Sequence, residues 1–267
     1  MPEGPEVTRM VEELSKIFKN STLKKIWIYD NKFKSKLSNL KRFNNSLPLK
    51  IKDVKNKGKF VYITLLDDWA LGFTPGMTGH FWIPGISKDF TTEEGYAYNP
   101  KYNYIYLETS KGNFYFNDPR KIGHFYIYDS KNVKNNLENK LKNLGPDLIK
   151  QLPKMSQSDF NDRLSKFYPN KNISDALLEQ KFIAGVGNYI RSEALYMAKI
   201  SPMRKIGSLS LNDKKRLKNA LKKVGQDSYR AQKDKLHTFT FKIYGNPNAK
   251  QTKRTGRTIW WNPKVQK

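Results

Sequence analysis

Residues 181–195 read KFIAGVGNYIRSEAL, a glycine-containing turn between two segments with helical periodicity. Gly185 and Gly187 permit close backbone approach and unusual backbone angles. The first backbone amides of the helix that follows could hold a phosphate group. A structural corner between two helices would use the same glycines, so the stretch by itself leaves both interpretations open.

The turn lies in a region whose apolar residues recur every three to four positions. This spacing predicts a helix that begins at Ser156 and further helices over 174–180, 188–198 and 211–224. We therefore expect a helical domain over 146–237. A Lys- and Asn-rich stretch precedes it, and we interpret 131–145 as a linker whose leucines permit a short helix.

The N-terminal half has a different pattern. After a predicted helix over 6–18, many short apolar runs separated by Gly and Pro turns indicate strands. Phe60–Leu65 with Trp69–Phe73 is one expected hairpin, and Tyr102–Leu107 with Phe114–Phe116 is another. The pattern indicates a β-sandwich or a barrel, and of these we expect a two-layered antiparallel β-sandwich over 1–130.

The last segment, 238–267, returns to strand character. Phe239, Phe241 and Ile243 alternate with polar residues and predict a strand, and the sequence TGRTIWW over 255–261 is its expected partner. The fold class is therefore α+β with two domains, the second of which carries a C-terminal β-hairpin.

The chain has 50 Lys and Arg against 24 Asp and Glu, a net charge of +26. Such a charge favours a polyanionic partner, and nucleic acid leads because phosphate neutralisation releases counterions. An anionic membrane is the rival, but we expect no membrane partner because no apolar run reaches the length of a spanning helix and no signal peptide is visible. An intracellular location is expected, and a nucleus, a bacterial cytoplasm or a virus-infected cell would all fit.

Cysteine is absent, which excludes disulfides, thiol nucleophiles and thiolate zinc sites. The three histidines, His80, His124 and His237, lie far apart and lack metal-ligand spacing. We therefore expect no zinc and no other cofactor.

The first seven residues, MPEGPEV, place an amine beside two carboxylates. Removal of Met1 would leave Pro2 with a free secondary amine, which is a nucleophile able to form an iminium with a sugar carbon. Glu3 or Glu6 could protonate a leaving or ring oxygen. A frayed, inert terminus is the alternative that these residues alone leave open.

Three separated stretches, MPEGPEV, KFIAGVGNYIRSEAL and GRTIWW, resemble in order and spacing the Fpg/Nei family of DNA glycosylases. The resemblance spans essentially the whole chain and is strongest to the endonuclease-VIII-like (Nei-like) branch with a zincless finger. It implies a helix–two-turns–helix motif in the helical domain and a bifunctional DNA glycosylase/AP lyase of base excision repair. The implied partner is DNA containing oxidised bases or abasic sites, bound by a monomer.

The resemblance also implies catalytic roles. Pro2 would attack C1′ of the damaged nucleotide, Glu3 would act as the general acid on the sugar ring oxygen, and Glu6 would support the N-terminus. Lys59, in the segment 57–60, would assist elimination. Arg257 stands where the family places the arginine of its finger, here without the four zinc-binding cysteines.

Further residues would bind DNA by the same resemblance. Extrusion of the damaged nucleotide leaves a hole in the base stack, which the family fills from two loops. These loops would supply Met77, Arg120 and Ile122, of which Ile122 replaces the expected Phe. The turn residues Gly185, Gly187 and Asn188 would bind phosphates that flank the lesion.

Two features of the sequence bear on which damaged base the chain removes. The zincless finger and the sequence Asn188-Tyr189-Ile190-Arg191 favour oxidised pyrimidines and hydantoins, with successive β- and δ-elimination. An Fpg-like preference for 8-oxoguanine and formamidopyrimidines is one alternative. A non-catalytic protein that binds damaged DNA is the other.

Overall fold

The computed structural model describes residues 2–34, 37–87, 98–129, 136–234 and 237–267. Two compact units are present. One contains residues 1–2 and 7–143, and the other contains residues 3–6 and 144–267. Each unit has its own hydrophobic core.

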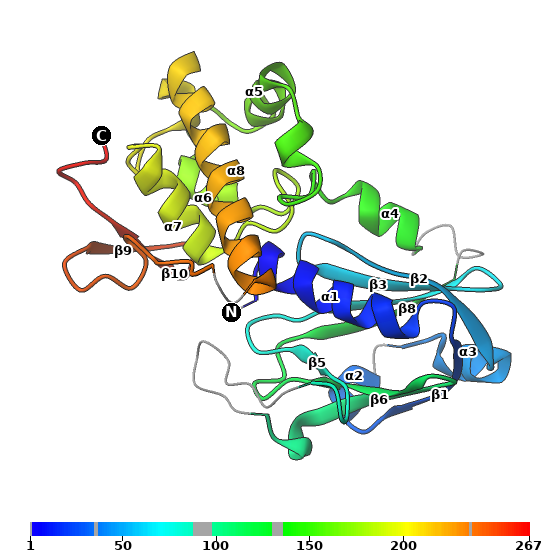
Figure 1. Cartoon of the computed structure of the whole chain (residues 1–267). Coiled ribbons are helices and arrows are strands. Elements are labelled where there is room, and N and C mark those ends of the chain that lie inside the picture. Colours follow the sequence, from blue (N-terminus) through cyan, green and yellow to red (C-terminus); the bar gives the residue numbers. More distant parts are fainter. Residues whose placement is uncertain (1, 35–36, 88–97, 130–135, 235–236) are drawn as a thin grey trace. The chain divides into compact units, whose positions relative to one another are not determined.

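The first unit is built on an antiparallel sheet with the strand order β5-β7-β6-β1-β2-β3-β4-β8. Strands β1 and β2 share only two register pairs, so the sheet divides there into two four-stranded halves. Both halves contribute to one core, and Figure 1 shows them as two layers. The predicted sandwich and both predicted hairpins, β3–β4 and β6–β7, are confirmed. The strands are β1 (Thr22–Ile28), β2 (Leu49–Lys57), β3 (Phe60–Leu65), β4 (Trp69–Thr74), β5 (His80–Trp82), β6 (Asn103–Thr109), β7 (Gly112–Asn117) and β8 (His124–Asp129).

Helix α1 (Gly4–Phe18) begins two residues before the predicted start. The carboxylate of Glu6 accepts the backbone N–H of Glu3 at 2.8 Å, which is half of a capping box and explains the earlier start. On the apolar face predicted from the sequence, Val7, Val11 and Leu14 are buried and the other residues are half-buried. The short helices of this unit are α2 (Asn31–Lys34), α3 (Leu40–Ser46), α4 (Leu137–Lys142) and the 3₁₀ turn η1 (Pro100–Tyr102).

Helix α4 lies inside the segment 131–145 that was expected to be a linker. Lys57 Nζ donates to the carbonyl of Leu141 at 2.9 Å, so α4 contacts the end of β2 within the first unit. Residues 131–135 of the expected linker lie outside the described residues. The division between the units falls after Asn143.

The helices of the second unit surround a core that includes Leu177, Ile190, Leu217 and Leu221. Ser156 and Ser210 cap two of these helices through their side chains. Helix α8 continues to Lys233, beyond the predicted end at Val224. The prediction ended too early because residues 225–233 show no apolar periodicity. The helices are α5 (Gln157–Ser165), α6 (Ile173–Leu178), α7 (Asn188–Met197) and α8 (Leu211–Lys233), with 3₁₀ turns η2 (Leu152–Lys154) and η3 (Ile206–Ser208).

The C-terminal hairpin consists of β9 (Lys250–Arg254) and β10 (Arg257–Trp261). Thr255 and Gly256 both have positive φ, 47° and 74°, as a two-residue hairpin turn of type I′ requires. Ile259 is fully buried in the helical core, so the hairpin belongs to the second unit.

The predicted strand at 239–243 is wrong, because the strand that pairs with β10 is 250–254. The carboxylate of Glu193 accepts the backbone N–H groups of Lys242, Ile243 and Tyr244 at 2.8–3.1 Å. Three successive amides that converge on one carboxylate cannot also form a strand ladder, and the alternating aromatic residues pack against each other instead.

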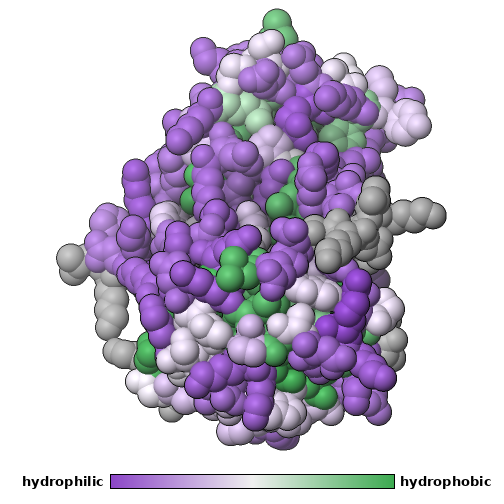
Figure 2. Space-filling model, turned by 90° about the vertical axis from the view of Figure 1, so that its right-hand side faces the viewer, coloured by the Kyte–Doolittle hydropathy of each residue, from purple (hydrophilic) through white to green (hydrophobic). Residues whose placement is uncertain are grey.

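The surface is strongly hydrophilic. In Figure 2 hydrophilic residues dominate the face shown, and hydrophobic residues form small groups between them. In the part of the chain that the structure describes, no helix is both long and apolar enough to cross a bilayer.

Candidate active site and DNA-binding residues

Glu3 is fully buried at the N-terminus of helix α7. Its Oε1 accepts the backbone N–H of Tyr189 at 2.9 Å, and its Oε2 lies 3.4 Å from the backbone N of Ile190. These amides have no partner within the helix, and the helix dipole favours negative charge at this end. The carboxylate therefore has a defined position directly after Pro2.

The two turn glycines make this approach possible. A Cβ atom at Gly187 would lie 2.2 Å from the carboxyl carbon of Glu3. Gly185 has φ +112°, and its carbonyl accepts the backbone N–H of Gly4 at 2.9 Å. Both glycines therefore have a structural function, which is to admit residues 3 and 4 to the turn.

Glu6 is bound by side chains of two helices of the second unit. Its Oε1 accepts the hydroxyl of Tyr189 at 2.9 Å and lies 3.4 Å from both Ser228 Oγ and Gln232 Nε2. Burial raises the pKa of Tyr189 well above its usual value, and the Glu6 and Glu3 carboxylates act in the same direction. Tyr189 therefore stays protonated and donates to Glu6.

Asn188 connects the turn to the C-terminal hairpin. Its Nδ2 donates to the carbonyl of Thr258 at 2.8 Å, and its Oδ1 accepts from Nη2 of Arg191. Thr258 follows Arg257, which is exposed at the start of β10. The second unit thus holds Asn188 beside the strand of Arg257, and Glu3 and Glu6 at the same helix start.

Two loops of the first unit place Met77 and Arg120 together. Thr78 Oγ1 donates to Asp118 Oδ1 at 2.5 Å and accepts the backbone N–H of Arg120 at 3.2 Å. Arg120 Nη1 lies 3.3 Å from the sulfur of Met77. The two loops that were predicted to fill the base stack are therefore joined by a buried hydroxyl–carboxylate contact.

Ile122 belongs to the same pair of loops. Gly76 has φ +67°, and a Cβ at that position would lie 3.1 Å from Ile122 Cγ1. Asp118 Oδ2 accepts the backbone N–H of Gly123 at 2.7 Å, which fixes the loop just after Ile122. Ile122 is half-buried against the loop of Met77.

Lys59 is half-buried in the turn between β2 and β3. Asn56 Nδ2 donates to Thr8 Oγ1 at 3.0 Å and to the carbonyl of Gly58 at 2.9 Å. The turn that carries Lys59 is therefore bound to helix α1. Pro2, also half-buried, immediately precedes Glu3.

Sequence reasoning gave no structural role to three charged residues near this site: Asp175, which is half-buried, and Arg191 and Glu193, which are buried. Arg191 is fully buried and Glu193 is 4% exposed. Charged residues are almost never so buried without partners. The sequence NYIRSEAL did contain a signal of buried charge, because Arg and Glu stand among apolar residues of a short predicted helix. Their partners lie 3 to 51 residues away along the chain, so the sequence did not indicate what they bind.

No set of three or more His, Asp or Glu side chains in the described ranges is placed to bind a metal ion.

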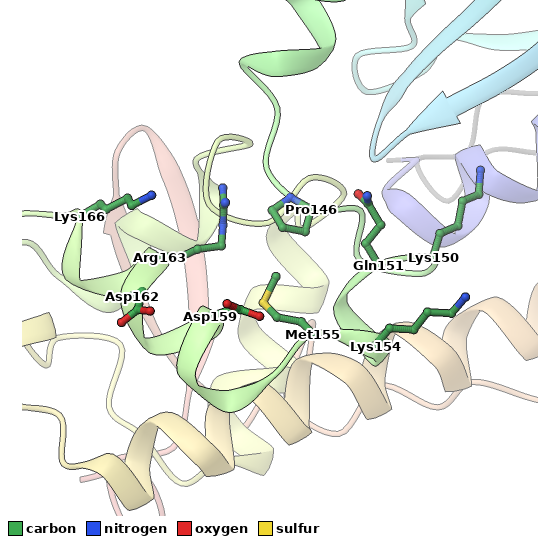
Figure 3. Close-up of a pocket in the computed structure, with 9 residues that line it drawn as sticks. All are labelled: Pro146, Lys150, Gln151, Lys154, Met155, Asp159, Asp162, Arg163 and Lys166. Carbon is green, nitrogen blue, oxygen red and sulfur yellow. The ribbon is translucent and has the colours of Figure 1, made fainter.

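A separate hollow of about 630 Å³ lies in the second unit beside α5, and Figure 3 shows its nine lining residues. Arg163, one of them, donates to the carbonyls of Phe182 and Lys181 at 3.1 and 2.6 Å and so holds the segment that enters the glycine turn. Burial lowers the pKa of Arg163. None of the site residues predicted from the sequence lines this hollow.

Two family models match the chain: the formamidopyrimidine-DNA glycosylase N-terminal domain over residues 1–125 and the H2TH domain of the same enzymes over residues 144–240. The chain belongs to the formamidopyrimidine-DNA glycosylase family. It is therefore a DNA glycosylase of base excision repair, and the enzymes of this family also have AP lyase activity. The H2TH match includes the turn with Gly185, Gly187 and Asn188.

Relatives of this family align over most of the chain. The formamidopyrimidine-DNA glycosylase of Arabidopsis thaliana is 26% identical over all of this chain and 71% of its own length. That of Ureaplasma parvum is 26% identical over 90% of this chain and 83% of its own length.

Solved structures show the same fold. The Lactococcus lactis enzyme bound non-covalently to DNA with an abasic site has a TM-score of 0.80 at 21% identity and 99% coverage of both chains. MutM in complex with DNA containing carbocyclic 8-oxo-G has a TM-score of 0.80 at 21% identity, with full coverage of both. The fold match therefore includes the hairpin region beyond residue 240, which the family models do not reach.

Proposed function

We propose that this chain is a bifunctional DNA glycosylase/AP lyase of the Nei-like branch, with a metal-free finger, that acts mainly on oxidised pyrimidines and hydantoins. One observation carries the proposal. The buried carboxylate of Glu3, next to Pro2, binds the first amides of α7, where Asn188 is bonded to the finger strand of Arg257. Glu3, the proposed acid, and the strand of Arg257 thus meet at the start of α7, and Pro2 directly precedes Glu3 in the chain.

The first chemical step is substitution at the sugar. The neutral amine of Pro2 forms a bond to C1′, and the glycosidic bond breaks as the base leaves with the electron pair. The nitrogen then loses its proton, which the departing base takes up directly or through water, so that the lone pair on nitrogen becomes available. Glu3 donates a proton to the ring oxygen as the ring opens, and the amine lone pair forms the iminium. The carboxylate that results is the form that the amides of Tyr189 and Ile190 stabilise.

Elimination then cleaves the strand. The iminium acidifies the C2′ proton, whose removal forms a double bond as the 3′ phosphate leaves. A second elimination releases the 5′ phosphate. We propose that Lys59 assists these steps at the backbone, and that neither a metal ion nor an organic cofactor takes part.

Binding of the extruded nucleotide uses the two loops of the first unit. Met77, Arg120 and Ile122 would fill the vacated stack, with Ile122 as an apolar wedge. Gly185, Gly187 and Asn188 would bind flanking phosphates. The amides of Tyr189 and Ile190, which the sequence offered for the same purpose, are instead bound by Glu3. The chain would act as a monomer on DNA containing oxidised bases or abasic sites, and its excess of Lys and Arg would supply sequence-independent affinity.

The lesion preference rests on the cysteine-free finger and on the sequence NYIR. The second candidate is the Fpg-like preference for 8-oxoguanine and formamidopyrimidines. It is supported by the match to a relative in complex with carbocyclic 8-oxo-G DNA. Another solved complex in the same family contains an oxidized pyrimidine, so the fold accommodates both classes.

Trapping with borohydride tests mechanism and preference together. Protein confirmed to begin at Pro2 is incubated with duplexes containing thymine glycol, 8-oxoguanine or no lesion. We expect a covalent adduct mainly on thymine glycol, and its loss in Pro2→Gly. An adduct mainly on 8-oxoguanine would keep the mechanism and move the chain to the second candidate, whereas no adduct on any lesion would favour a non-catalytic protein that binds damaged DNA.

A further inference from the structure

We propose that Asp175 is the anchor of the finger hairpin and a positioning residue for Arg257. The proposal rests on the proposed function of Arg257 at the lesion. Arg254 Nη2 lies 2.7 Å from Asp175 Oδ2, an ion pair between β9 and α6. The Asp175 side chain is 11% exposed and that of Arg254 is 34% exposed, so this pair is less screened by solvent than a surface pair.

The hairpin transmits this anchor directly to Arg257. Arg254 and Arg257 are register partners across the two-residue turn Thr255-Gly256. Their Cα atoms are the last pair of the ladder, so a force that fixes Arg254 also fixes the backbone of Arg257. The ion pair therefore acts on the tip of the hairpin.

A second bond fixes the adjacent residue of β10. Arg191 offers only N–H donors, so the Asn188 oxygen must face Arg191 and the Asn188 amide nitrogen must face the carbonyl of Thr258. Asn188 thereby holds Thr258 while Asp175 holds Arg254. Helix α6 thus contacts β9 across from Arg257, and the start of α7 contacts β10 directly after Arg257.

Charge explains why the anchor is a carboxylate. Burial lowers the pKa of Arg191 to about 10; the nearby carboxylates of Asp175 and Glu3 oppose this shift, and Arg257 adds to it by repulsion. Within the described residues, Nε and Nη1 of Arg191 have no hydrogen-bond partner, so this buried cation depends on such charges. Asp175 thus offsets the repulsion between Arg191 and the finger arginine.

The test is a double-mutant cycle with Asp175→Asn, Arg254→Gln and the double variant, measured on full-length protein. We expect each single variant to lower the single-turnover rate on thymine glycol duplex by about 10- to 100-fold, the cost of a small misplacement of a reacting group. DNA affinity should fall by less than the rate. The double variant should be no slower than the slower single variant, because both changes break the same contact.

The matched control is Asp213→Asn. Asp213 is a similarly buried carboxylate of the same unit, with Arg204 and Arg216 as partners. It accepts the backbone N–H of Ser210 in the capping box of α8, away from the hairpin contact of Asp175. It should lower the melting temperature yet keep the wild-type rate well below that temperature. Three results would contradict the proposal that Asp175 anchors the hairpin. The first is a wild-type rate in Asp175→Asn, and the second is additive effects in the double-mutant cycle. The third is a loss of rate in both Asp175→Asn and Asp213→Asn in proportion to their loss of melting temperature. Arg257→Ala separates the role of Arg257 at the lesion from the positioning role of Asp175. A full rate in Arg257→Ala would contradict the role of Arg257. A slow rate in Arg257→Ala with wild-type rates in the Asp175 and Arg254 variants would contradict only the role of Asp175.

Discussion

The carboxylate of Glu3 occupies the space that a side chain at position 187 would fill. The distance from the carboxyl carbon to a Cβ built at Gly187 would be 2.2 Å, far below any real contact. Gly187 has an extended backbone with φ −130°, so space and not backbone strain requires glycine here. The turn glycine and the candidate acid are therefore one structural unit.

Replacement of Gly187 by Ala should displace Glu3 from the start of α7. We expect base excision from a thymine glycol duplex to fall by at least about 100-fold, because the acid loses its position relative to the sugar. Single-turnover gel assays measure this. Gly207→Ala, which adds a methyl group against Pro169 in the same unit, is the matched control and should keep its activity.

Replacement of Glu3 by Gln keeps the shape of the side chain but removes its proton donor. Base removal should slow by about 100-fold or more, while cleavage of a preformed abasic site should slow far less, because no base has to leave. Rates on thymine glycol and abasic duplexes are compared under single turnover. Equal losses on both would show that Glu3 serves only as the cap of α7.

Glu193 holds the segment 242–244 through backbone amides. Glu193→Ala should lower the free energy of unfolding by about 3 kcal/mol, since hydrogen bonds to a buried charge are lost. The segment should also become sensitive to proteolysis before the rest of the unit unfolds. Glu13→Gln, at a half-exposed position of α1, should change neither property.

His80 makes the stability of the first unit depend on pH. Burial lowers its pKa from 6.5 to about 4, and its Nδ1–H donates to the carbonyl of Thr78 at 2.9 Å. Between pH 6.5 and 4 the unfolded chain binds a proton that the folded chain does not, so stability falls as the pH falls through this window. The expected loss is on the order of 3 kcal/mol. Urea unfolding at pH 7 and pH 4.5 should show a smaller difference in His80→Asn, and an unchanged difference would contradict this assignment.

Chelation should leave the enzyme active. A chain without cysteine has no thiolate site for zinc. We expect equal cleavage rates with and without EDTA on thymine glycol duplex. A rate restored only by added metal after EDTA treatment would overturn the proposal of a metal-free reaction.

Local patterns were sufficient to predict most elements. The helical spacing from Ser156 and the strand pattern at 60–73 lie within single elements whose buried face is continuous, and both predictions are correct. The segment 239–243 failed because its alternation looks like a strand, whereas its following amides bind Glu193 from another helix. Sequence periodicity carries no information on such a long-range polar contact.

The candidate site was predictable only in part for the same reason. Family motifs indicated Pro2, Glu3 and Asn188, whose places the structure gives, while their roles are still predictions. Asp175 lies in no such motif, and its partner Arg254 is 79 residues away. The charge of a residue is visible in a sequence, but the residue that neutralises it is visible only in the fold.

The hairpin that carries Arg257 is held by a carboxylate, an amide and a buried isoleucine, all of which are chemically inert to mild oxidants. Fingers built on zinc thiolates expose sulfur, which oxidants convert to sulfenic acid or disulfide. Oxidised bases form under the conditions that attack such sulfur. Under the proposed function, this hairpin would stay folded during oxidative stress and under zinc starvation.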